Sequence, residues 1–488
     1  MKTSLLTATT LSLTLLAVQP AFADAETDVL RAEVKALEAR IDELEKRNHA
    51  QQQNAAAPAA VKAPASIDKR LAIVERKQEV DEETQQAKDA VTPKFEYTPG
   101  RGLLLTTPDR QYALRMSGYI QADDRSFEDP GSRGTPDTFL IRSARPVIEA
   151  KLTDYFDTRF QMDFGRGAST VLDAYGDFHP MPGNQLVNLR AGEFKVPVGL
   201  ERWQSESDVL FVERGQTTNL VPYRDMGAML YGQIIPDQLE YQLALVNGAV
   251  DLTTNPNTGD TDNDKDVAGR VMVHPLTWSG VEALQGLGVG VGGTYGNHQG
   301  NVTTSGLTTG YVTFGQRTFF NYQSGSYANG AQWRLNPQLM YYNGPLGALA
   351  EYIFDDQEIK NGTHVARLGN KAWEGIAEWV LTGEDASFDG VTPAHNFDPK
   401  AGQWGAFELV GRVSQLNVDH DAFVSSIFAN PATSAQSAFE TTLGGTWYFS
   451  RAVKFNLDFS RTAFDGGYVG GLDHPDEEAV LSRMQFRF

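Results

Sequence analysis

Apolar and polar residues alternate one by one along several stretches of the chain. The first such stretch is QYALRMSGYIQAD (111–123), in which Leu114, Met116 and Ile120 share one face with other apolar residues. The same alternation recurs in DYFDTRFQMDF (154–164), AFETTLGGTWYF (438–449), VKFNLDFS (453–460) and VLSRMQFRF (480–488). A period of two residues is typical of a β-strand that has one apolar face and one polar face. These stretches therefore predict a sheet whose two faces meet different environments.

Two all-β architectures fit this pattern, a soluble sandwich and a closed barrel that crosses a membrane. The stretches are about ten residues long, as tilted membrane-crossing strands require, and aromatic residues gather toward their ends. Charged residues such as Arg159 and Asp458 occur in mid-strand on the polar face, which suits a water-filled lumen. A large sandwich would need a repeat or a more regular strand length, and the chain shows neither. We therefore predict an all-β fold, a transmembrane antiparallel β-barrel.

The predicted number of strands is sixteen. The chain contains roughly fourteen to sixteen strand-like stretches, and bacterial barrels made from a single chain have an even number of strands. Short turns near Asp237, Pro345 and Arg451 alternate with long polar loops at 251–266 and 296–330. The strand boundaries near 356–403 stay open, because residues 385–403 do not fit a short turn.

Charged residues of both signs occupy the positions that the alternation assigns to the inner wall. The inner wall is therefore expected to be mixed in charge. The predicted lumen-wall residues are Arg115, Arg145, Arg159, Arg190, Asp157 and Asp163.

The connection at about 193–224 is too long and too apolar for a simple surface loop. It contains Trp203 and the run Val209–Val212, which need a surface to pack against, and the inner wall of the barrel is such a surface. A loop folded inward would narrow the lumen and present charge at a constriction, where a pore selects ions by sign. An external loop without a filtering role is the alternative. The predicted constriction cations are Lys195, Arg202, Arg214 and Arg224, beside Glu201, Glu206, Asp208 and Glu213.

The N-terminal part of the chain does not show the two-residue alternation. Lys2 and the apolar run that follows it predict an export signal with small residues before the cleavage position. Leu30, Val34, Leu37, Ile41 and Leu44 alternate steps of four and three, the seam of a short coiled coil. The predicted organisation is a signal peptide at 1–23, a coiled-coil helix at 24–47, an Ala/Gln/Pro-rich linker at 48–66, a second helical and charged segment at 67–92, and the barrel at 93–488.

Composition excludes several classes of protein. The 488 residues include no cysteine, which rules out a disulfide scaffold and a thiolate metal site, and we expect no cofactor. The formal charge of −20 argues against a nucleic-acid partner. The eight histidines are scattered and form no catalytic or metal-binding motif, so a membrane-embedded hydrolase is disfavoured.

Two long blocks of sequence resemble one known family. RSARPVIEAKLTDYFDTRFQMDFG (142–165) and AGEFKVPVGLERWQSESDVLFVERGQTTNLVPYRDMG (191–227) resemble the phosphate-selective porin O/P family of Gram-negative outer membranes, and the resemblance continues to the C-terminus. It implies a homotrimeric sixteen-stranded porin in outer-membrane lipid, an inward-folded third loop, and passage of anions such as phosphate or polyphosphate. It also implies that the terminal Phe488 is a signal for the barrel assembly machinery, and that the N-terminal helices lie in the periplasm.

The sequence also departs from the family and leaves alternatives open. Glu193 stands where many members have a lysine, and the acids on the wall weaken the case for phosphate. A general or sugar-preferring porin is one alternative. A structural or adhesive barrel, tethered to the cell wall through its N-terminal helices, is another. The acidic run Asp260–Asp266 is read either as a weak Ca²⁺ site or as a solvated charge run.

Overall fold

The computed structural model describes residues 71–72, 74–80, 82–84, 92–128, 136–249 and 262–488. The chain divides into two units, of which the first ends at Thr84. Its described residues are helical, in line with the helix expected within 67–92. The predictions for 1–23, 24–47 and 48–66 lie outside the described residues.

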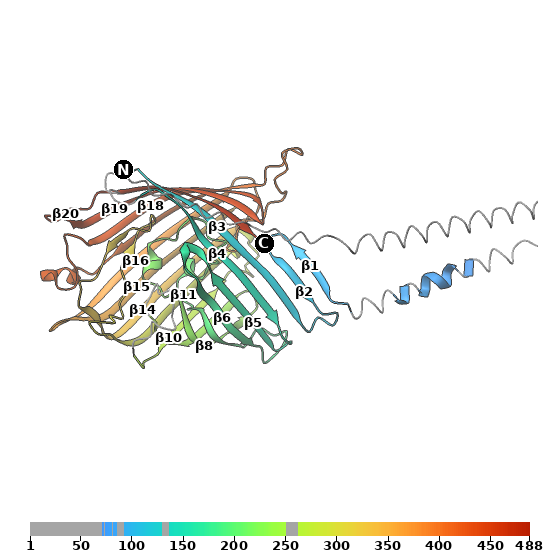
Figure 1. The fold of residues 1–488 in the computed structure, drawn as a ribbon, viewed down its shortest axis with the longest axis horizontal. Coiled ribbons are helices and arrows are strands. Elements are labelled where there is room, and N and C mark those ends of the chain that lie inside the picture. Colours follow the sequence, from blue (N-terminus) through green and yellow to red (C-terminus); the bar gives the residue numbers. More distant parts are fainter. Residues whose placement is uncertain (1–70, 73, 81, 85–91, 129–135, 250–261) are drawn as a thin grey trace, which may run out of the picture. The chain divides into compact units, whose positions relative to one another are not determined.

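Sixteen antiparallel strands close into a barrel, as the alternation predicted (Figure 1). Each strand pairs with the next along the chain, and the last strand pairs with the first, so that Arg487 lies opposite Tyr119. The barrel strands are β3 (Ala113–Phe127), β4 (Thr138–Lys151), β5 (Phe156–Asp163), β6 (Thr170–Phe178), β7 (Asn188–Lys195), β8 (Arg224–Ile235), β9 (Leu239–Val246), β10 (Asp266–Val273), β11 (Leu287–Gln299), β14 (Ser326–Asn343), β15 (Leu346–Asn361), β16 (His364–Val380), β17 (Ala406–Asn417), β18 (Ala435–Ser450), β19 (Val453–Tyr468) and β21 (Glu477–Arg487).

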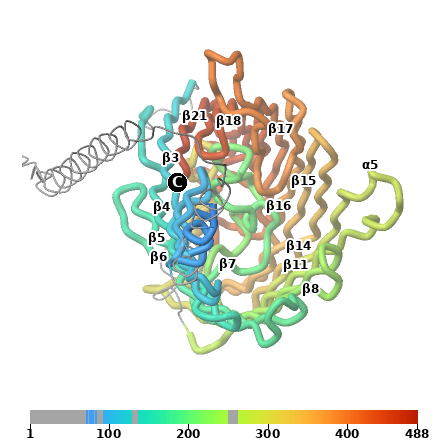
Figure 2. The backbone as a smooth tube through the Cα atoms, turned by 90° about the vertical axis from the view of Figure 1, so that its right-hand side faces the viewer, coloured from blue at the N-terminus to red at the C-terminus, as the bar shows by residue number. Residues whose placement is uncertain are grey.

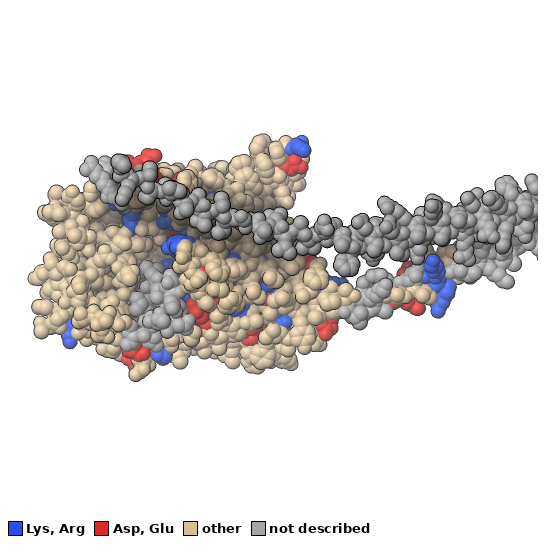
Figure 3. Space-filling view, viewed as in Figure 1, with Lys and Arg blue, Asp and Glu red and all other residues tan. Residues whose placement is uncertain are grey.

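The two faces of the wall differ in polarity as expected. On β3, Met116 and Ile120 are exposed on the outside, whereas Gln121 and Asp123 are buried on the inside. Figure 3 shows that few charged residues lie on the part of the outer wall that faces the viewer. The apolar side chains therefore form the outer surface of the barrel, and the polar ones line the interior.

The connections at the two ends of the barrel differ in length. Tight turns near Asp237, Pro345 and Arg451 lie at the same end as the C-terminus, which we call the turn end. The opposite end, the loop end, has most of the longer connections, although residues 361–364 form a tight turn there and the long connection 381–405 lies at the turn end. The longer connections of the loop end contain the short elements η2 (Gly165–Gly167), α3 (Leu200–Trp203), η3 (Gln216–Asn219), β12 (Tyr311–Val312), β13 (Thr318–Phe320), η4 (His420–Ala422), η5 (Val424–Ser426) and β20 (Leu472–Asp473), while α5 (Glu282–Gln285) lies at the turn end.

A hairpin that the sequence did not predict precedes the barrel at the turn end. It consists of β1 (Lys94–Thr98) and β2 (Gly102–Thr106), joined through Gly100 with φ 75°. β2 pairs with residues 113–116 of β3, below the point where β21 begins to pair with the same edge. The hairpin thus continues the sheet past the seam that closes the barrel.

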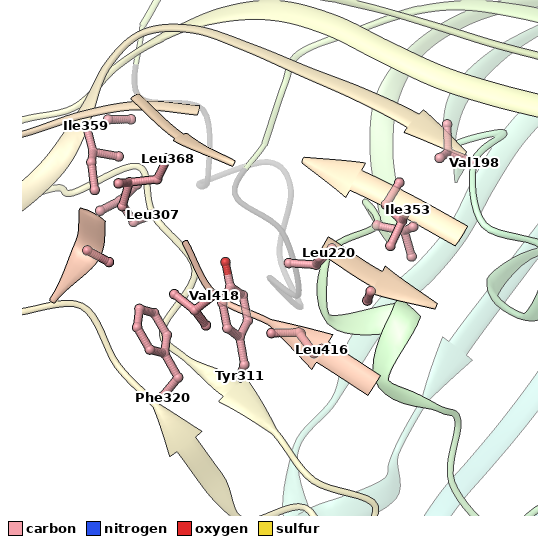
Figure 4. Packing of buried hydrophobic residues seen from close by; sticks show 14 of the residues in the cluster. Val198, Leu220, Leu307, Tyr311, Phe320, Ile353, Ile359, Leu368, Leu416 and Val418 are labelled. Carbon is pink, nitrogen blue, oxygen red and sulfur yellow. The ribbon is translucent and has the colours of Figure 1, made fainter. Parts of the chain in front are cut away.

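The segment 196–223 between β7 and β8, here called the inner loop, lies against the inner face of β14–β19. Its apolar run Val209–Val212 is buried, and the backbone N–H of Val212 donates to Asp458 of β19 at 2.6 Å. Figure 2 looks toward one end of the ring and shows part of the green chain within it. In Figure 4, Leu220 of the inner loop lies in one cluster with Ile353 and Leu416 of the wall. The loop begins three residues later than expected, because β7 continues to Lys195.

The long connection 381–405 explains why the sequence around 385–403 did not fit a turn. Its first half lies inside the rim, where Ala386 and Val391 are buried against Tyr448. Its second half packs on the outer face, where the rings of Phe397 and Trp447 are 5.5 Å apart. The connection therefore folds over the rim at the turn end.

Candidate functional site

A cavity of about 580 Å³ lies between the inner loop and the wall formed by β3–β10. We call it the lumen cavity. Cations, acids and aromatic residues all contribute to its lining. They include Arg145, Arg159, Arg190, Lys195, Arg224, Arg270, Asp173, Glu206, Asp237, Glu240, Asp389, Tyr119, Tyr175 and Trp203.

Lys195 and Arg224 form a pair of cations at the level of the inner loop. They lie directly opposite each other, at the last position of β7 and the first of β8. Lys195 donates from Nζ to the backbone oxygens of Trp203 at 3.2 Å and Gln204 at 2.8 Å. Within the described part of the chain, no acidic side chain forms an ion pair with Lys195. Its amino group borders the lumen cavity, opposite Arg224.

Arg202 and Arg214 lie close to this pair but do not line the cavity. The guanidinium groups of Arg202 and Arg224 lie over the ring of Tyr223, at 5.0 and 4.4 Å from its centre. Arg202 donates to the backbone oxygen of Thr218 at 2.7 Å. The structure thus brings all four predicted cations together, but it exposes only Lys195 and Arg224 to the cavity.

Arg214 holds the inner loop in shape. Its guanidinium donates to Glu206 and to the backbone oxygens of Glu201 at 3.1 Å and Gln204 at 3.0 Å. Burial alone would raise the pKa of Glu206, but the charges of Arg214 and Arg145 outweigh burial and hold that pKa well below its usual value. Glu206 is therefore ionised and compensates two arginines at the edge of the cavity.

A second ionic cluster fixes the inner loop to the wall. Glu213 accepts from Arg125 of β3 at 2.5 Å and from Arg142 of β4 at 2.6 Å. Burial favours the neutral acid, but the charge of Arg142 and its hydrogen bonds prevail and lower the pKa of Glu213 to about 2. On the other side of the loop, Arg412 of β17 donates to Glu201 at 3.2 Å. These contacts fix the loop's position across the interior.

Most wall arginines have an acidic partner. Arg145 donates to Asp163 at 2.7 Å, and Asp173 accepts from both Arg159 at 3.1 Å and Arg224 at 2.7 Å. These predicted wall residues therefore lie in ion pairs, and their net field in the lumen is smaller than the number of cations suggests.

Arg190 combines an ion pair with aromatic contacts. It binds Asp177 through two hydrogen bonds of 2.8 and 3.0 Å. Its guanidinium lies 3.8 Å from the ring centre of Tyr175 and 5.1 Å from that of Tyr231. Packing between two rings holds the planar cation in one orientation toward the cavity.

The remaining two predicted wall residues lie farther toward the turn end. Arg115 is 3.9 Å from Glu149, and Asp157 is 3.1 Å from His179. Both line a separate cavity of about 300 Å³. They belong to the inner wall but not to the constriction.

Arg270 of β10 is a cavity residue that the sequence-based prediction missed. It donates to Glu240 at 2.6 Å, and its guanidinium lies 5.8 Å from the ring centre of Trp203. The signal was present in DVAGRVMV (266–273), where Arg270 shares the inward face with Met272.

The acidic run Asp260–Asp266 is described only in part. Asp262 accepts from the backbone N–H of Gln299 at 2.5 Å, and Asp264 accepts from Asn297 at 2.5 Å. In the described ranges, no group of three His, Cys, Asp or Glu residues is arranged to hold a metal ion. A search of the same residues for helices long and apolar enough to cross a membrane found none.

A closed barrel with an apolar outer wall and a charged, cavity-bearing interior defines the class of β-barrel channels. The chain belongs to the family of phosphate-selective porins O and P, whose family model matches residues 114–488. This confirms the family that the sequence blocks indicated, and the protein is an outer-membrane porin channel.

Individual proteins of known identity are similar to this chain. Porin O of Pseudomonas aeruginosa is 25% identical over 424 residues, which cover 79% of this chain and 91% of that protein. The outer-membrane channel DcaP of Acinetobacter baumannii superposes with a TM-score of 0.51 at 8% identity, over 78% of this chain and 98% of that one, and it supports the fold. OmpT of Vibrio cholerae superposes with a TM-score of 0.46 at 10% identity, over 78% of this chain and 98% of that one.

Proposed function

We propose that this porin lets small hydrophilic anions, phosphate or polyphosphate among them, diffuse through the lumen cavity. The observation that carries the proposal is Lys195, which lines the cavity opposite Arg224 and donates to two backbone oxygens of the inner loop. A fixed positive charge attracts permeant anions, and it acts most strongly where the passage is narrow and its walls exclude water. Arg224 stands opposite and adds a second positive charge at the same level.

The alternative is a general porin with weak anion preference. The acids that pair with Arg145, Arg159 and Arg224 favour it, because each ion pair reduces the field available to a permeant ion. Glu193, which stands near Arg224, is a further acid where many family members have lysine. The two functions differ in the strength of selectivity and in whether phosphate competes with chloride.

Reversal potentials in planar bilayers distinguish the two. With a KCl gradient across the membrane, we expect the unaltered channel to favour chloride, and added phosphate to reduce the chloride current. Lys195→Gln should lower the anion preference and relieve the phosphate block, whereas Lys400→Gln, at an exposed position outside the lumen cavity, should change neither. The proposal would be contradicted if the channel favoured potassium, or if Lys195→Gln had the same selectivity as the unaltered channel.

We further propose that the protein acts by transport and not by catalysis, as a homotrimer in outer-membrane lipid with its N-terminal helices in the periplasm. Contact of these helices with the cell wall remains one alternative for their role. Chemical crosslinking of the purified protein in detergent tests the trimer, because a trimeric channel gives a ladder that ends at three copies.

We also propose that Phe488 is a signal for the barrel assembly machinery. In the folded barrel it completes the seam: its backbone N–H donates to Gly118 at 2.9 Å, and its carbonyl accepts from the same residue at 2.8 Å. These bonds form only when the barrel closes, so an assembly factor would meet the terminal residue before closure. Deletion of Phe488 should slow assembly in cells more than it lowers the stability of the assembled channel.

A further inference from the structure

The β1–β2 hairpin presents an apolar face that continues the outer wall of the barrel. The register places Tyr97 opposite Leu103, Leu103 opposite Met116, and Met116 opposite Ile148. The next strand extends this row to Phe160. Residues opposite one another in neighbouring strands point to the same side of the sheet. One uninterrupted apolar row thus runs from the membrane-facing wall onto the hairpin.

The aromatic residues of β1 are among the most exposed apolar side chains of the described part of the protein. The exposed fraction is 71% for Phe95 and 60% for Tyr97, against 50% for Met116 on the barrel wall itself. The alternate residues Lys94 and Glu96 point to the other side of the sheet. Exposed apolar surface costs free energy in water, at about 25 cal/mol per Å², so this face requires a cover.

The hairpin lies at the turn end of the barrel, below the seam between β3 and β21. Short turns are characteristic of the periplasmic end of outer-membrane barrels, so the turn end faces the periplasm. Aromatic side chains favour the boundary between acyl chains and headgroups, where the ring is buried and a polar atom such as the Tyr97 hydroxyl reaches water. Both the position and the composition of the face match this boundary.

We propose that the outer face of the β1–β2 hairpin binds the periplasmic leaflet of the membrane, with Phe95 and Tyr97 inserted among phospholipids. The hairpin then acts as an interfacial anchor in front of the first barrel strand. This inference follows from membership of the porin family and from the continuous outer wall, and it does not depend on the ion selectivity of the lumen. A second copy of the chain covering the same face is the competing outcome.

Single-cysteine labelling tests the proposal directly, because the chain has no native cysteine. Phe95→Cys and Tyr97→Cys are labelled with a nitroxide, and Lys94→Cys and Glu96→Cys serve as matched controls on the same strand. The channel is reconstituted in vesicles of phosphatidylethanolamine and phosphatidylglycerol. Collision rates with oxygen, which concentrates in lipid, and with a water-soluble nickel chelate are then measured by electron paramagnetic resonance.

We expect labels at positions 95 and 97 to collide more with oxygen and several-fold less with the nickel chelate than labels at 94 and 96. Equal nickel accessibility at all four positions would place the hairpin in water and overturn the proposal. Protection from both reagents at 95 and 97, with spin–spin coupling between copies, would assign the face to a neighbouring subunit and also overturn it. Heat-modifiable migration in gel electrophoresis first verifies that each variant has folded as a barrel.

Discussion

The two halves of the barrel wall differ in charge and in their cover. Cations and acids stand together on β5–β10, here called the open half. Most charged residues that face inward from β15–β19, the covered half, are acids, and the inner loop lies along that half. On β5–β10 the inward residues include Arg159, Arg190 and Arg270, which face the lumen cavity. On β15–β19 they include Glu351 and Asp458, which lie beneath the inner loop. The chain's net charge of −20 therefore does not describe the field that a permeant ion meets.

The acids of the covered half bind the loop. Glu351 accepts from the backbone N–H groups of Leu200 at 2.7 Å and Glu201 at 3.2 Å. Asp458 accepts from the backbone N–H of Val212 at 2.6 Å. A carboxylate that accepts backbone N–H groups is satisfied without a cation. The acids of the covered half thus anchor the loop, which leaves the open half to line the passage.

The largest expected effect comes from breaking the anchor at Arg412. This fully buried guanidinium donates to Glu201 at 3.2 Å, to the backbone oxygen of Glu213 at 3.1 Å, and to Glu440 at 3.0 Å. Arg412→Met would leave these buried acids without their cation, which typically costs about 3–5 kcal/mol. We expect a lower unfolding midpoint in urea, and larger, noisier conductance steps because the loop is released.

Arg461→Met is the matched control for this prediction. Arg461 is also a strand arginine with a carboxylate partner, Asp476 at 2.7 Å, but its side chain is 58% exposed. Exposed pairs of this kind contribute about 0–1 kcal/mol. If both variants lost the same stability, or if Arg412→Met left the conductance unchanged, the inner loop would not depend on the covered half.

Acid should release the loop from its other side, through Glu213. The pKa of this carboxyl is about 2 in the folded protein, below the 4.5 of a free glutamate, because Arg142 and Arg125 stabilise the ionised form despite burial. A depressed pKa contributes stability that is present above pH 4.5 and is lost as the pH falls toward 2. The difference corresponds to about 3 kcal/mol, at about 1.4 kcal/mol per pH unit.

Urea unfolding of the reconstituted protein at pH 7, 4.5, 3 and 2 measures this loss. Glu213→Gln should already be less stable at pH 7, and its stability should decline less between pH 4.5 and 2. Parallel pH profiles for the two proteins would show that Glu213 does not hold the loop.

Much of the barrel was predictable because a period of two residues directly reports which face a side chain occupies. The predicted stretch 453–460 begins at the first residue of β19, and the predicted stretch 480–488 ends one residue after β21. The inward assignment of Arg145 and Arg159 holds for the same reason. Burial on one face selects both the strand and its register, so a local pattern is sufficient.

The features that were missed depend on contacts between segments distant in sequence. No local signal shows that Glu213 meets Arg125 and Arg142, or that Arg214 braces the loop and does not line the cavity. The hairpin at 94–106 did have a local signal, because Pro99-Gly100 separates the alternating run KFEYT from the apolar run GLLLT. The connection 381–405 had none, since its halves face opposite sides of the wall.

The smallest expected effect concerns the open half, where Asp173 neutralises Arg159 and Arg224. Asp173→Asn keeps the size of the side chain but removes its charge, so both arginines act more strongly on permeant anions. One charge at about 4 Å in water is worth about 1 kcal/mol, which is roughly a fivefold change in the local concentration of an ion. We expect the reversal potential in a KCl gradient to shift toward chloride, with little change in urea stability.

Asp398→Asn, at an exposed position of the 381–405 connection, is the control and should leave the reversal potential unchanged. A shift toward potassium in Asp173→Asn, or equal shifts in the two variants, would mean that the open half does not control which ions pass.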